Sequence, residues 1–245
     1  FDANALWAER RAERVLAPSH AARAHLERLG VPGDRIDVLG YPVSNAILEA
    51  PPRSVARQQL GLAGGAWALL SLGGEGVAAQ PRRWIDALLA EGLQVMVIAG
   101  RNDALRATLS KHPAAGSRLL VLGYVDDMAL RLAAVDVVVG KAGPASVLEA
   151  VALRKPFLVT SYAGHNERAV VRFLERSRCG RWVEQPRDFA RALHEVRDVE
   201  AERPDFQRMR DDLGRHLVDL AHGRAPSAPL GLDRDPWRHR EGVPS

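Results

Sequence analysis

Cysteine, long apolar runs and the common signatures of catalytic sites are what this sequence lacks. Its 245 residues include one cysteine, Cys179, which excludes an intrachain disulfide and a cysteine-based metal cluster and fits a reducing compartment. No apolar run approaches the ~18–20 residues that a membrane-spanning helix requires. The sequence contains no P-loop, HExxH motif, zinc-ligand spacing or Ser-His-Asp context, which argues against the familiar hydrolases and phosphotransferases.

The charges are nearly balanced, and no long run of one sign occurs. Lys and Arg number 34 against 30 Asp and Glu, which gives a formal net charge of +4. A basic protein can attract nucleic acid or anionic lipid, but this excess is small, so we expect no nucleic-acid partner. The acid-x-acid motif at Asp233 and Asp235 has no evident third ligand, and we interpret it as solvated charge rather than as a metal site.

Short apolar, β-branched runs alternate with helical patterns along most of the chain. This alternation predicts an α/β fold, in which helices cover both faces of a parallel sheet and ligands bind beyond the carboxyl ends of the strands. The predicted strands are 14–17, 36–39, 68–72, 94–99, 119–122, 137–139, 157–160 and 181–183. The predicted helices are 21–29, 81–91, 104–111, 128–134, 144–153, 167–177 and 189–196.

The alternation is interrupted at Leu48–Val55, where consecutive prolines indicate a linker. We therefore predict the end of a first, truncated α/β domain at 1–47, a linker at 48–57, a six-strand Rossmann-like domain at 58–223 and a flexible tail at 224–245. A long charged helix at 205–222 is expected to close the larger domain. The chain begins at Phe1 rather than at methionine, so we expect it to be part of a longer protein.

The most informative motif is VDVVVGKAGPASVLEA, from Val135 to Ala150. A β-branched run ends at Gly140, and Pro144 follows Gly143 at the first position of a helix, where proline is well tolerated. The unpaired amide groups and the positive dipole end of that helix predict a phosphate site. Glu149 lies roughly 9 Å further along the helix axis, about the distance from a nucleotide's diphosphate to its ribose hydroxyls. The motif therefore predicts a nucleoside diphosphate site.

Three further loops follow predicted strands, and each has a ligand-binding and a structural interpretation. SLGGEG contains Gly73 and Gly74, whose backbone can approach an anion closely, but it lacks the dinucleotide-binding spacing and also fits a tight turn. Arg101 could contact a phosphate or a base, or form a surface ion pair. The backbone at Tyr124 and Val125 could pair with a base edge, or belong to an Asp-capped turn.

A last group of candidates opens the helix that follows strand 157–160. Asn166 and Glu167 lie at the carboxyl end of that strand, beside the predicted phosphate site, where their side chains could bind sugar hydroxyls. His165 could act as a general base, but a single histidine in a loop is more often solvated, and we do not favour a catalytic role for it.

As an ordered set, SLGGEG, VIAGRND, VLGYVDDM, DVVVGKAGPASVLEA and GHNERAVVRF resemble the C-terminal, donor-binding domain of GT-B glycosyltransferases. The most similar members are the monogalactosyldiacylglycerol synthases, the processive diacylglycerol glucosyltransferases and MurG. RVLAPSHAARAHLERLGVPGDRIDVLGYPV resembles the end of the N-terminal domain of the same family. The resemblance covers roughly residues 14–196, and its GRN and KAGP segments favour the galactolipid synthase branch.

The resemblance implies donor-binding roles for residues of each motif, and we add Arg101 to them as a donor-binding candidate. The implied contacts are Gly73 and Gly74 near the phosphates, the backbone of Tyr124 and Val125 at the uracil, Gly143, Pro144, Ala145 and Ser146 at the diphosphate, Glu149 at the ribose, and Asn166 and Glu167 at the donor sugar. The family usually has glycine and threonine where Ala145 and Ser146 stand, and asparagine near Val170.

The implied enzyme is an inverting hexosyltransferase that transfers sugar from a UDP-sugar to a lipid acceptor such as diacylglycerol, without a metal or a cofactor. Its catalytic base, commonly a histidine, belongs to the family's N-terminal domain. We therefore expect this chain to bind UDP and to transfer little sugar by itself. The resemblance implies a cytoplasmic protein, peripheral at the inner face of the plasma membrane.

Three alternatives remain open. The protein could be a MurG-like N-acetylglucosaminyltransferase, or a non-catalytic donor-binding subunit that works beside an acceptor-domain partner. A UDP-sugar 2-epimerase, which shares the two-domain architecture, is the third.

Overall fold

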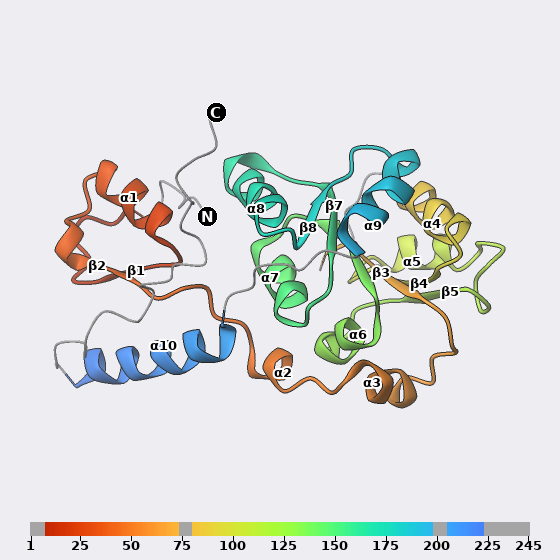
Figure 1. The fold of residues 1–245 in the computed structure, drawn as a ribbon, viewed down its shortest axis with the longest axis horizontal. Coiled ribbons are helices and arrows are strands. Elements are labelled where there is room, and N and C mark those ends of the chain that lie inside the picture. The colour runs from red at the N-terminus through yellow and green to blue at the C-terminus, as the bar shows by residue number, and fades with distance from the viewer. Residues whose placement is uncertain (1–7, 74–79, 198–204, 223–245) are drawn as a thin grey trace. The chain divides into compact units, whose positions relative to one another are not determined.

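The computed structural model describes residues 8–73, 80–197 and 205–222, with the backbone alone for Gly164, His165, Asn166 and Arg197. The described residues belong to two compact units (Figure 1). The smaller unit combines the N-terminal residues up to Val43 with the C-terminal helix, and the larger unit begins at Ser44. Within the described ranges, each helix is too short or too polar to span a bilayer.

A parallel sheet of six strands forms the centre of the larger unit, which confirms the predicted α/β fold class. Its strands are buried apolar runs, as expected for a sheet that is covered on both faces. Their order is β5-β4-β3-β6-β7-β8, the doubly wound arrangement of Rossmann-like folds. The strands are β3 (Trp67–Ser71), β4 (Gln94–Ile98), β5 (Leu119–Leu122), β6 (Val137–Lys141), β7 (Phe157–Ser161) and β8 (Gly180–Trp182).

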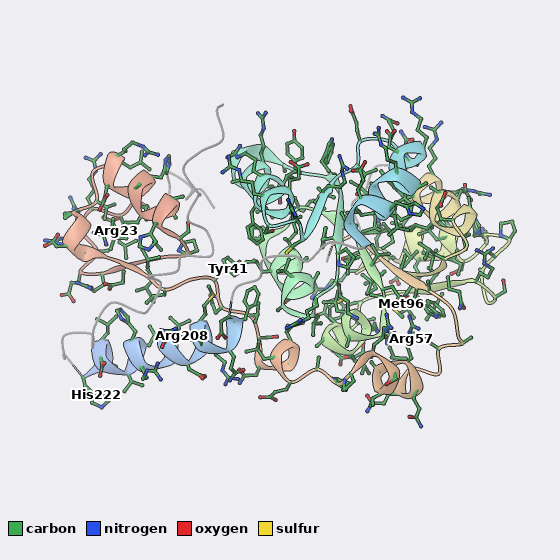
Figure 2. All side chains as sticks on the ribbon, viewed as in Figure 1. Arg23, Tyr41, Arg57, Met96, Arg208 and His222 are labelled. Atoms are coloured by element: carbon green, nitrogen blue, oxygen red, sulfur yellow. The ribbon has the colours of Figure 1, made fainter. Side chains whose placement is uncertain are left out.

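Helices cover both faces of this sheet (Figure 1). One face is covered by α4 (Pro81–Ala90), α5 (Asp103–Leu109) and α9 (Phe189–Arg197), which follows the short helix η3 (Pro186–Asp188). Trp84, Leu109 and Phe189 from these helices share one core cluster with the strands. The other face is covered by α6 (Met128–Ala134), α7 (Pro144–Ala152) and α8 (Gly164–Arg176). Met96 on β4, labelled in Figure 2, is fully buried.

The direction in which the sheet grows reverses between β3 and β6. From β3 the chain moves outward through β4 to β5, and then returns through α6 to β6 on the opposite side of β3. Doubly wound sheets bind their ligands at the carboxyl ends of the strands on either side of such a reversal. The loops after β3 and β6 therefore occupy the position expected for a binding site.

The smaller unit is a short parallel pair with two helices. Strands β1 (Val15–Ala17) and β2 (Ile36–Val38) are connected by α1 (His20–Arg28) and the short helix η2 (Gly33–Arg35). Ser19 caps α1 by accepting a hydrogen bond from the Ala22 amide. Helix α10 (Phe206–Ala221) belongs to this unit. Nε2 of its buried His216 lies 3.1 Å from a carboxylate oxygen of Asp37, which also accepts from Arg14.

Two segments differ from the organisation expected from the sequence. The interval 48–57, expected to be a linker, contains most of α3 (Arg53–Gln59), which follows α2 (Asn45–Leu48). Arg57 on α3 donates to Asp136 beside the sheet at 2.6 Å (Figure 2), so this segment packs on the larger unit. Helix α10 was expected to close the larger domain, but its contact with Asp37 assigns it to the smaller unit. The expected tail at 224–245 lies outside the described residues.

Candidate functional site

The loops at the carboxyl edge of the sheet carry the residues that were predicted to bind the donor. Because all six strands are parallel, these loops leave the sheet along one edge. Gly73 follows β3, Arg101 follows β4, Tyr124 and Val125 follow β5, Gly143 to Ser146 follow β6, and Glu167 follows β7.

Two glycines near the end of β6 have different roles. At Gly140 a Cβ atom would lie 2.7 Å from the carbonyl oxygen of Ser71, so glycine allows β6 to pack closely against β3. Gly143 is the N-cap of α7, and there a Cβ would meet only Ser146 Oγ, at 3.9 Å. Packing therefore requires glycine at Gly140 but not at Gly143, where the space lies open to a ligand.

The first turn of α7 presents backbone donors to that space. Pro144 occupies the first helical position, as predicted, and Ala145 is exposed. The Val147 amide donates to the carbonyl oxygen of Gly143 at 3.0 Å, whereas the amides of Ala145 and Ser146 precede the first intrahelical bond. Together with the helix dipole, these two donors suit a phosphate.

Glu149 lies further along α7 and is only partly exposed. Burial raises the pKa of its carboxyl above the usual value of 4.5, because desolvation disfavours the charged form. Within the described part of the molecule, its carboxylate makes no hydrogen bond or ion pair. A half-buried acid without a partner is energetically costly, so Glu149 is suited to a ligand that donates hydrogen bonds.

An ion pair joins the loops after β6 and β7. Lys141 Nζ lies 2.5 Å from Glu167 Oε1, and the other oxygen of Glu167 accepts from the amide of Ala163, the N-cap of α8. Both carboxylate oxygens of Glu167, predicted to bind the donor sugar, are thus engaged within the protein. Lys141 was not among the predicted donor-binding residues. Its position between a buried strand and the Gly-Pro start of a helix could have identified it as a candidate.

Arg101 and Tyr124 form a second feature of this edge. The guanidinium carbon of Arg101 lies 4.6 Å from the centroid of the Tyr124 ring, within the range of a cation–π contact. The Tyr124 side chain is 61% exposed, so this planar pair is accessible to a ligand. Next to it, Asn102 caps α5 by accepting from the Leu105 amide at 2.9 Å.

Of the remaining candidates, the structure describes Gly73 in full, His165 and Asn166 by their backbone alone, and Gly74 not at all. Gly73 has a φ of +76° and open space around its Cβ position, which suits a backbone that approaches a ligand. Its neighbour Gly74 lies outside the described residues. The side chains of Asn166 and His165 also lie outside the described part of the structure.

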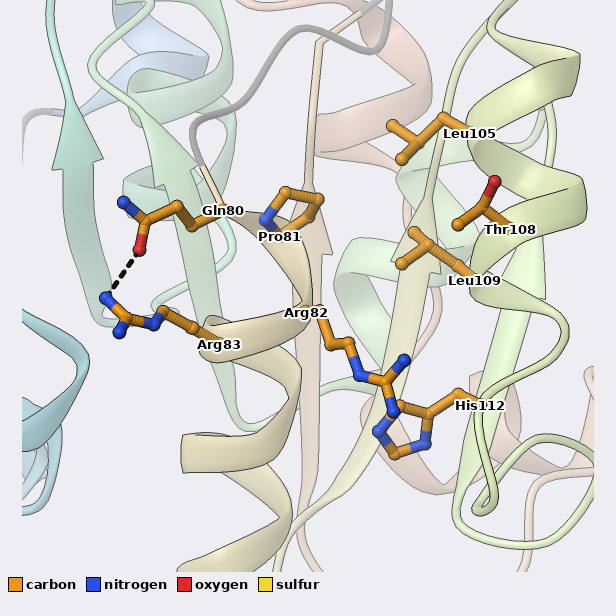
Figure 3. A pocket seen from close by; sticks show the side chains of 8 residues that line it. All are labelled: Gln80, Pro81, Arg82, Arg83, Leu105, Thr108, Leu109 and His112. Carbon is orange, nitrogen blue, oxygen red and sulfur yellow. Dashed lines mark hydrogen bonds between the residues drawn. The ribbon is translucent and has the colours of Figure 1, made fainter.

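A groove of about 630 Å³ lies between α4 and α5 (Figure 3). Leu105 and Leu109 contribute apolar surface to it, and Arg82, Arg83 and His112 contribute polar groups. Its other lining residues are Gln80, Pro81 and Thr108. None of the predicted donor-binding residues lines the described wall of this groove, so it is separate from the site at the end of β6.

The strand order defines a Rossmann-like fold. The amide-rich start of α7 lies beside the reversal point, where folds of this kind bind nucleotides. Residues 79–195 match the model of the "Glycosyltransferase family 28 C-terminal domain". This match confirms the resemblance of the larger unit to the C-terminal domain of GT-B glycosyltransferases.

Two curated relatives are similar to this chain in sequence. The chain is 28% identical to monogalactosyldiacylglycerol synthase 1 of Arabidopsis thaliana over 201 residues, 76% of this chain and 37% of that protein. It is 25% identical to the processive diacylglycerol beta-glucosyltransferase of Bacillus pumilus over 181 residues, 71% of this chain and 46% of that protein. The chain thus spans less than half the length of these two relatives.

The structure of Anabaena HepE in complex with UDP and glucose is similar in fold, with a TM-score of 0.55 at 18% identity. The similarity covers 87% of this chain and 65% of that one.

Proposed function

We propose that the larger unit binds the UDP moiety of a UDP-sugar, and that the protein is an inverting hexosyltransferase acting on a lipid acceptor such as diacylglycerol. The family match supports the reaction class. The two curated relatives support the acceptor, since both are named for diacylglycerol lipids. The HepE complex supports the donor, since it contains UDP and glucose on a similar fold.

The observation that carries the donor site is the half-buried carboxylate of Glu149, which has no partner among the described residues and lies beyond the amide-rich start of α7. A diphosphate at the Ala145 and Ser146 amides leaves the ribose directed along the helix toward Glu149. A carboxylate that makes no hydrogen bond to a described residue can then accept hydrogen bonds from both ribose hydroxyls. The exposed pair of Arg101 and Tyr124 offers a planar surface for the base.

The same arrangement supports the departure of UDP in the reaction. Negative charge accumulates on the diphosphate as the bond to the sugar breaks, and fixed amide donors and a helix dipole stabilise that charge without reorganising. The acceptor hydroxyl must lose its proton to a general base, which the resemblance assigns to the family's N-terminal domain. We propose that the protein acts peripherally at the inner face of the plasma membrane, where its lipid acceptor lies.

Titration calorimetry with UDP tests the donor site. We expect the wild-type chain to bind UDP and Glu149→Gln to weaken binding by about tenfold or more, because hydrogen bonds to a charged group are lost. With 2′-deoxy-UDP the difference between the two proteins should shrink, since one donating hydroxyl is absent. Glu184→Gln is the matched control, because Glu184 is an exposed acid that follows β8 along the same edge. Failure to bind UDP, or equal affinities in all three proteins, would exclude the site.

An assay of the full reading frame tests the reaction. Hexose transfer from UDP-galactose and UDP-glucose to diacylglycerol in mixed micelles is expected. Interconversion of the free UDP-sugars without an acceptor would instead identify a 2-epimerase, and transfer only to a lipid-linked peptidoglycan precursor would identify a MurG-like enzyme.

A further inference from the structure

We propose that Lys141 binds the diphosphate of the donor and that Glu167 competes with the diphosphate for this lysine. The inference rests on the proposed function, since it assigns two further roles within the same donor site. In the unliganded protein the ammonium group of Lys141 pairs with Glu167. When the donor binds, this ammonium group pairs with the phosphates instead.

The position of Lys141 favours a contact with the diphosphate. It is the last residue of β6 and lies two residues before Gly143, the N-cap of α7. The strand pair is irregular here: Gly140 pairs with Val159 but Lys141 pairs with Ser161. The additional residue, Thr160, belongs to β7, so the irregularity places Lys141 opposite Ser161, where the chain leaves β7 toward α8. The Lys141 side chain remains 47% exposed, so its ammonium group is accessible to a bound anion.

The contacts of Glu167 make it a competitor rather than a catalytic residue. One carboxylate oxygen accepts from Lys141 at 2.5 Å, and the other accepts from the Ala163 amide at the start of α8. The side chain is only 13% exposed, so its charge is weakly screened by solvent. The charge of Glu167 repels a diphosphate bound beside α7. The diphosphate can pair with the ammonium group of Lys141 only when the Lys141–Glu167 ion pair opens. Glu167 therefore acts on the donor through Lys141, as a positioning residue.

Opposite effects of the two substitutions test the inference. We expect Lys141→Gln to weaken UDP binding roughly tenfold, because a charge-assisted contact with phosphate is lost. Glu167→Gln should strengthen UDP binding roughly threefold, because a competing carboxylate of modest strength is removed while the amide oxygen can still accept from Ala163. In the double variant the gain from Glu167→Gln should be smaller, since the lysine for which it competes is absent. Titration calorimetry with UDP at one fixed salt concentration measures all four proteins.

Matched controls separate this effect from general electrostatics and from misfolding. Arg168→Gln removes an exposed cation next to Glu167 in the sequence, and Glu91→Gln removes an exposed acid at the far end of α4; both should leave UDP affinity unchanged. Uridine, which lacks phosphates, should bind all variants equally in saturation-transfer NMR, which also reports that the site is folded.

The outcomes distinguish this inference from the proposed function. If wild-type protein does not bind UDP, the donor site itself is wrong. If wild-type protein binds UDP but Glu167→Gln binds it equally or more weakly, competition is excluded. If Lys141→Gln binds UDP as wild type does, the contact with phosphate is excluded.

Discussion

Strand β6 is flanked by two carboxylates with opposite surroundings. Asp136 precedes the strand, where Arg53 and Arg57 donate to it and the Trp67 amide donates to Oδ2 at 2.7 Å. Glu149 follows the strand in α7 and has no hydrogen bond or ion pair with a described residue. The two acids are thirteen positions apart in the sequence and lie toward opposite edges of the same sheet.

The difference separates a structural acid from the acid that we propose to bind the donor. Asp136 has each oxygen bonded, and its partners attach α3 and the start of β3 to the sheet. Buried polar groups are satisfied in this way when their role is to hold the fold. Glu149 bears the desolvation cost without a compensating bond from any residue that the structure describes, and such acids are typical of functional sites. Stability and ligand affinity should therefore respond to the two acids in opposite ways.

Asp136→Asn should produce the largest loss of stability. Arg53 and Arg57 would keep their charges while the neutralising acid is lost, so we expect the free energy of unfolding to fall by about 2 kcal/mol. Urea denaturation followed by circular dichroism measures the change. UDP affinity of the folded variant should equal that of wild type, and a weaker affinity would show that the two acids are not independent. Glu149→Gln should leave stability unchanged or increase it, since it removes a desolvated charge.

Gly140→Ala and Gly143→Ala should likewise separate an effect on stability from an effect on UDP affinity. Both effects should be somewhat smaller than those of the substitutions at Asp136 and Glu149. At Gly140 the added methyl would lie 2.7 Å from the Ser71 carbonyl oxygen, and we expect a loss of about 1–2 kcal/mol from overpacking. At Gly143 the methyl meets no close neighbour, so the melting temperature should fall only by the small cost of alanine at an N-cap, while UDP binds more weakly. Equal melting temperatures for the two variants would contradict this division.

The pH dependence of UDP binding should give the smallest effect. Because burial raises the pKa of Glu149, this carboxyl becomes protonated at a higher pH than an ordinary glutamate. Only the ionised form accepts hydrogen bonds from both ribose hydroxyls, so affinity should fall as the pH falls through the raised pKa. Glu149→Gln lacks this component and retains only the fall caused by protonation of UDP itself, near pH ~6. The UDP affinities of the two proteins, measured by calorimetry at a series of pH values, should diverge as the pH falls. Parallel plots of affinity against pH would contradict the prediction.

Local sequence patterns predicted much of the larger unit. The strands of the sheet lie within about two residues of their predicted limits, because β-branched runs bounded by glycine and proline carry a strong local signal. The start of α7 at Gly143 and Pro144 was predicted for the same reason. Helix α3 was missed because prolines that begin a helix and prolines that occupy a linker look alike in sequence.

Contacts between distant residues could not be predicted in this way. Asp37 and His216 are separated by 179 positions, and Arg57 and Asp136 by 79. Nothing local to either member identifies its partner, so the unit to which α10 belongs and the packing of α3 were predicted wrongly. The pairing of Lys141 with Glu167 could not be predicted for the same reason. The lack of a partner for Glu149 also emerges only from the folded chain.

The irregular pairing of β6 with β7 has a consequence for how this edge of the sheet can vary. Thr160 is skipped between the pairs Gly140–Val159 and Lys141–Ser161. Successive residues of a strand point to alternate faces, so one additional residue exchanges which side chains reach each face beyond that point. Inserting or deleting a single position here would change the chemistry beside the start of α7 while the sheet itself stays intact. If the proposed donor site is correct, its selectivity for the sugar is open to alteration by a change in loop length, without replacement of any residue proposed to contact the nucleotide.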